Sequence, residues 1–177
     1  SRAKQVTITQ DVQKRLLEYN QHIDKYGNTF INKLIYNRRI ILVEDVVGNY
    51  FSHFTPQFLF WGGDANGRHH VVGMGLFYVW ELPFLLLGVY ASVFLPRKIR
   101  FILLSWILLA PLPASLSIPA PHALRSLNML PVPQIFIALG LLWAYIKLVS
   151  QWRFVFILCL LFISTFSFTR YLYLYYI

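Results

Sequence analysis

The chain is poor in cysteine and in charge. Cys159 is the single cysteine among 177 residues, which excludes an internal disulfide. Charged residues make up only 13% of the sequence, and 7 acidic residues stand against 16 lysines and arginines. Neither a Gly-x-Ser-x-Gly nor a His-Glu-x-x-His motif occurs. The sequence therefore offers no residue set that would carry out a complete reaction.

Apolar and aromatic residues are abundant instead. Hydrophobic residues account for 57% of the chain and aromatic residues for 18%, above the roughly half-apolar composition of soluble domains. Basic residues are dense before residue 70 and sparse after it, and those before residue 70 alternate with acidic ones. We do not expect a nucleic-acid partner, because the cations form no dense stripe. Attraction to anionic lipid headgroups explains the basic excess.

The hydropathy pattern predicts an all-α, polytopic membrane protein. Four apolar segments each approach the ~20 residues needed to cross a bilayer, over residues 76–95, 101–117, 131–149 and 154–172. They form a predicted transmembrane bundle over residues 76–177. Residues 1–75 form a predicted surface region, with amphipathic helices at about 9–26 and 29–53. The second helix either lies in the membrane interface or packs on a soluble neighbouring domain.

Loop charges predict the orientation of the bundle. The link at 96–100 and the link near residue 151 are flanked by Lys and Arg, so both are expected on the cytoplasmic side. Residues 1–75, the loop at 118–130 and the C-terminus then lie on the external face of the cell membrane.

The predicted external loop at 118–130 contains the first candidate site. His122 and Arg125 are three residues apart and follow several prolines, so a helical turn would place them on one side, near free backbone N–H groups. Arg offers a planar fork of donors to phosphate oxygens. The alternative is that Arg125 extends to the interface and His122 caps a helix.

A second candidate site is the glycine-rich loop at 62–70. Arg68, His69 and His70 are candidate phosphate or substrate ligands, and Asp64 is a candidate supporting residue. The spacing matches no P-loop or dinucleotide motif. No cofactor is predicted.

Two further interpretations concern a metal and a carboxylate. A metal site would need His53 and His122 together with the histidines of the 62–70 loop, but no Cys or carboxylate cluster completes it, so no metal is predicted. Glu81 lies at the edge of the first apolar segment, where a carboxylate is a functional candidate. Its alternative role is to pair with Arg68 or Arg125 and orient a loop.

Several motifs together resemble one family. They are NYFSHFTPQFLF at 49–60, GDANGRHH at 63–70, GMG at 73–75, ELP at 81–83 and PHALRS at 121–126. In order and separation they resemble prokaryotic relatives of the dolichyl-phosphate-mannose protein mannosyltransferases. The resemblance covers roughly residues 49–135.

This resemblance implies a GT-C type membrane glycosyltransferase. Such an enzyme transfers a sugar from a polyprenyl-phosphate lipid on the external face to a protein, lipid or glycan acceptor. It also implies a catalytic aspartate in a first external loop, after the first membrane helix. We therefore expect the catalytic base to lie outside these residues, which would be a piece of a longer protein and would contribute contacts to the donor phosphate.

Two alternatives from other classes stay open. A transporter or lipid flippase fragment would also have bent helices, but it should carry polar groups along a central path through the bundle. A non-catalytic membrane assembly subunit would explain the missing catalytic base.

Overall fold

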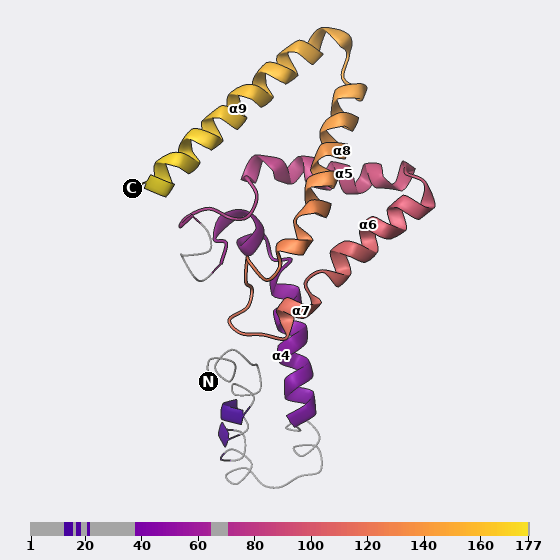
Figure 1. The fold of residues 1–177 in the computed structure, drawn as a ribbon. Helices are drawn as coiled ribbons and strands as arrows, with labels where there is room; N and C mark the ends of the chain where they lie inside the picture. The colour runs from indigo at the N-terminus through magenta and orange to yellow at the C-terminus, as the bar shows by residue number, and fades with distance from the viewer. Residues whose placement is uncertain (1–12, 16, 19–20, 22–37, 65–70, 177) are drawn as a thin grey trace.

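The computed structural model describes residues 13–15, 17–18, 21, 38–64 and 71–176. Within these ranges the chain is helical and contains no strand, as the composition predicts. In chain order the helices are α4 (Arg38–Ser52), η1 (Gln57–Trp61), η2 (Val79–Glu81), α5 (Leu82–Ala91), η3 (Ser92–Phe94), α6 (Arg97–Leu109), α7 (Leu112–Ser115), η4 (Leu127–Met129), α8 (Pro131–Lys147) and α9 (Ser150–Tyr176) (Figure 1). The predicted helix at 9–26 lies mostly outside the described residues, and the one at 29–53 is described from Arg38 onward as α4.

Three helical stretches are long and apolar enough to cross a membrane. They are Arg97–Ser115, which is α6 followed by α7, then Leu127–Lys147 and Ser150–Tyr176. They correspond to the last three predicted segments, with boundaries shifted by a few residues. A short break at Ala110 and Pro111 separates α6 from α7, because proline lacks the N–H that would continue the helical hydrogen bonds.

The first predicted segment is shorter than expected. Its helical part, Val79–Phe94, is apolar but falls below the 18 residues that define a candidate span. It is also divided into η2, α5 and η3. At 1.5 Å per residue this stretch covers less than the ~30 Å of a hydrocarbon core.

Helices α5 and α8 cross at two glycines. A Cβ atom added at Gly88 would overlap the carbonyl oxygen of Phe136, and one added at Gly140 would overlap the carbonyl oxygen of Phe84. The two backbones are therefore in direct contact, as small residues allow where helices cross in membrane proteins. This crossing forms the centre of the helical assembly (Figure 1).

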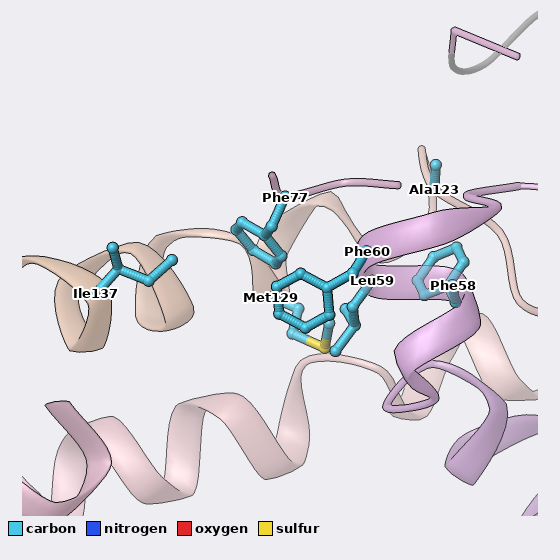
Figure 2. Packing of buried hydrophobic residues seen from close by; sticks show 7 residues of the cluster. All are labelled: Phe58, Leu59, Phe60, Phe77, Ala123, Met129 and Ile137. Atoms are coloured by element: carbon cyan, nitrogen blue, oxygen red, sulfur yellow. The ribbon is translucent and has the colours of Figure 1, made fainter. Parts of the chain in front are cut away.

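An apolar core joins the segment after α4 to the start of α8. Its buried members are Phe58, Leu59, Phe60, Phe77, Ala123, Met129 and Ile137 (Figure 2). The backbone N–H of Phe77 donates to the carbonyl oxygen of Leu59 at 2.8 Å, so residues on both sides of the 65–70 segment are held together. This core fixes the position of the loop at 118–130, because Ala123 and Met129 belong to both.

Candidate functional site

A chain of three buried polar residues links two distant parts of the sequence. His53 follows α4, Asp64 follows η1, and His122 lies in the loop between α7 and η4; we call them the histidine–aspartate bridge. Their exposed fractions are 0%, 3% and 6%. Buried polar groups are stable only when hydrogen-bonded, so their contacts define the bridge.

Asp64 holds the loop through its carboxylate. Its Oδ2 accepts a hydrogen bond from the backbone N–H of Ala123 at 2.9 Å and lies 3.4 Å from Nδ1 of His122. The Asp64 side chain has no exposed surface. Its position suits a supporting residue, because a carboxylate closed off from solvent contributes to structure through such bonds.

The contacts of His53 define its tautomer. Its Nδ1 lies 2.7 Å from the carbonyl oxygen of Asn49, which can only accept, so Nδ1 carries the proton. Its Nε2 accepts a hydrogen bond from the backbone N–H of His122 at 3.3 Å. Both contacts suit the neutral ring. Burial lowers the pKa of His53, and hydrogen bonds to the carbonyls of Asn49 and Tyr50 and the charge of Asp64 only partly oppose this effect.

The backbone at 122 and 123 differs from the sequence-based prediction. The helical structure after the prolines begins with η4 at Leu127, and residues 123–126 form turns instead. The backbone N–H groups of His122 and Ala123 donate to the side chains of His53 and Asp64, which come from a segment about 60 residues earlier in the sequence. These two N–H groups therefore support the loop through bonds within the chain.

Arg125 lies beside the bridge and is half-buried. Its Nη1 donates to Oγ of Ser117 at 2.9 Å and to the carbonyl oxygen of Ile118 at 3.2 Å. Guanidinium has five N–H donors on three nitrogens, and these two bonds use one nitrogen. Arg125 thus braces its own loop, and its Nε and Nη2 make no hydrogen bond within the described part of the chain.

The other candidate residues are placed as follows. Arg68, His69 and His70 lie outside the described residues. Oε2 of Glu81 accepts a hydrogen bond from the backbone N–H of Tyr78 at 2.8 Å, so this carboxylate caps the start of η2. Among the described residues, no group of three or more His, Cys, Asp or Glu is arranged to hold a metal ion.

Sequence reasoning gave too small a role to two residues. The sequence indicates His53 only as a possible metal ligand and a member of the 49–60 motif, and Ser126 only as a member of the 121–126 motif, yet both support the loop. Oγ of Ser126 donates to the carbonyl oxygen of His122 at 2.9 Å. Their place inside the two motifs at 49–60 and 121–126 was the available signal, but a motif does not show which residues face each other.

Comparisons with protein-family models, with curated proteins and with solved structures found no match.

Proposed function

We propose that this chain is part of a glycosyltransferase that moves a sugar from a polyprenyl-phosphate lipid to an acceptor on the external face of the cell membrane. In this proposal the chain contributes contacts to the donor phosphate. One observation carries it: the histidine–aspartate bridge brings His53 of the 49–60 motif and Asp64 of the 63–70 motif against the 121–126 motif, about 60 residues later in the sequence. Buried hydrogen bonds hold these motifs in one arrangement, which supports one region formed by all three.

The distribution of charge supports the loop at 118–130 as part of the proposed donor-phosphate site. The loop at 118–130 holds Arg125, while the interiors of the three candidate spans are nearly free of charge. A transporter would need polar groups along its path through the membrane. Chemistry at one membrane face needs them only at the helix ends, which is where they are found.

The proposed membrane arrangement follows the loop charges. Val79–Phe94 serves as a fourth, short membrane segment shielded by α8, and the links around 96–100 and 148–153 face the cytoplasm. The surface region before α5 and the 118–130 loop then share the external face.

Arg125 has the chemistry for the phosphate of the donor. During transfer the acceptor hydroxyl attacks the sugar, the bond from the sugar to the phosphate oxygen breaks, and a base takes the hydroxyl proton. Negative charge grows on the departing lipid phosphate, and a fixed guanidinium stabilises it. The base comes from outside this chain in our proposal, since Asp64 is closed off by its own contacts.

Donor binding tests this role of Arg125. In the full-length protein in lipid nanodiscs, Arg125→Ala should weaken binding of a polyprenyl-phosphate sugar by about 10- to 100-fold, the usual loss for a charge-assisted hydrogen bond. Sugar transfer should fall with it.

Ser117→Ala is the matched control. It removes one of the two loop contacts of Arg125 but leaves the cation and its bond to Ile118, so donor affinity should change less than about threefold. Unchanged affinity in Arg125→Ala would remove Arg125 from the phosphate site. Equal losses in both variants would show that Arg125 only supports the loop.

A further inference from the structure

A second site lies away from the histidine–aspartate bridge. A cavity of about 610 Å³ separates the C-terminal half of α9 from the aromatic segments on either side of residues 65–70. Figure 1 shows α9 extending from α8 back toward this part of the chain. The volume falls within the ~300–1,000 Å³ range of ligand sites.

The walls of this cavity are mostly apolar. Trp61, Phe77 and Trp80 form part of one wall, and Ile163 and Phe166 on α9 form part of the other. Water gains little in such a space, whereas an apolar chain fills it favourably. The lining thus favours an acyl chain.

Arg170 is the cation among the described residues that line the cavity. It lies on the last turns of α9 and is exposed, and these described lining residues include neither Asp nor Glu. It is followed by Tyr171, Tyr173 and Tyr175, and aromatic residues of this kind mark the level of the lipid headgroups. A positive charge at headgroup level above an apolar cavity matches an anionic lipid.

The position of α9 gives the bilayer access to the cavity. Only 6% of an apolar stretch of 18 residues within α9 is buried inside the chain. In a membrane most of this helix faces lipid, so a lipid can enter from the side. Neither Arg125 nor any residue of the histidine–aspartate bridge lines the cavity.

We infer that this cavity holds one acyl chain of an anionic glycerophospholipid from the bilayer, with the lipid phosphate contacting Arg170. The inference requires a membrane but not glycosyl transfer. Bilayer phospholipid is favoured over the sugar donor because the cavity is separate from the residues proposed for the donor phosphate.

Native mass spectrometry of the full-length protein tests this assignment. The protein is purified in detergent and mixed with equal amounts of phosphatidylglycerol and phosphatidylcholine with identical chains. The wild type should retain one phosphatidylglycerol with about fivefold preference, the effect of one cation near the lipid surface. Arg170→Gln should lose this preference and Arg170→Lys should restore it.

A second variant fills the cavity. Ser167 lies on the cavity side of α9 and Thr165 does not line it. Ser167→Trp should therefore lose the retained lipid, while Thr165→Trp should keep it. Arg97→Gln, which removes an exposed cation at the start of α6, should also keep it.

Three results would overturn the inference. One is a preference that persists in Arg170→Gln; another is equal lipid retention in Ser167→Trp and the wild type. The third is displacement of phosphatidylglycerol by an equal amount of polyprenyl phosphate, which would assign the cavity to the donor lipid.

Discussion

Helices α8 and α9 are alike in sequence and different in surroundings. Their candidate spans have the same mean hydropathy, 1.8, yet 33% of the Leu127–Lys147 window is buried within the chain and only 6% of the Ser150–Tyr176 window. Helix α8 packs against α5, while α9 presents most of its apolar surface outward. Hydropathy identifies a span, but it does not show whether lipid or protein covers it.

The largest expected effect compares one phenylalanine from each helix. Phe136 on α8 is 1% exposed and Phe162 on α9 is 76% exposed. Phe136→Ala should lower the free energy of unfolding by about 3–5 kcal/mol, because it leaves a cavity beside α5. Phe162→Ala should change it by less than about 0.5 kcal/mol.

Thermal unfolding in nanodiscs, followed by circular dichroism, measures both variants. Equal destabilisation by Phe136→Ala and Phe162→Ala would mean that α9 is packed as tightly as α8. The inferred difference in burial between the two helices would then be wrong.

The next effect concerns the glycine crossing. Gly88→Ala should cost about 1–3 kcal/mol, because the new methyl group meets backbone atoms of α8 that have no room to move. Gly48 on α4 has no atom within 4 Å of an added Cβ, so Gly48→Ala should be neutral or stabilising by up to about 1 kcal/mol. The unfolding midpoints of the two variants give the comparison. A tolerated Gly88→Ala would show that α5 and α8 are further apart than described.

The smallest effect is the pH dependence from His53. Burial lowers its pKa in the folded state, so the unfolded state takes up the proton first as the pH falls through about 6.5. The contribution to stability is therefore complete above that pH and is lost below it. Asp64 and His122 also face this group.

Unfolding midpoints measured between pH 7.5 and 5.5 check this sign. The wild type should lose stability over this range, and His53→Gln should show a shallower slope. A slope that is equally steep in His53→Gln would place the titration elsewhere.

Much of the fold could be predicted from composition and spacing. Runs of apolar residues located the three candidate spans to within a few residues, because length and hydropathy are properties of a continuous segment. The predicted first segment, 76–95, is longer than the helical part that the structure shows. Glu81 caps a short helix at its start and Pro96 follows its end, so the helical part is shorter than the apolar run.

The candidate site was less predictable. The residue types of His122 and Arg125 indicated a polar loop, but their partners lie elsewhere in the sequence. Spacing within the loop gave no sign that His53 and Asp64 would occupy its backbone donors.

The sequence by itself determined that this chain is helical, apolar and divided into segments suited to a membrane, because those properties depend on neighbours along the chain. Only the tertiary structure decided that α8 is covered and α9 is not, that glycines meet at the α5–α8 crossing, and that a buried carboxylate holds the loop of Arg125. These features require contacts between residues about 50 to 70 positions apart, and such contacts depend on how whole helices pack.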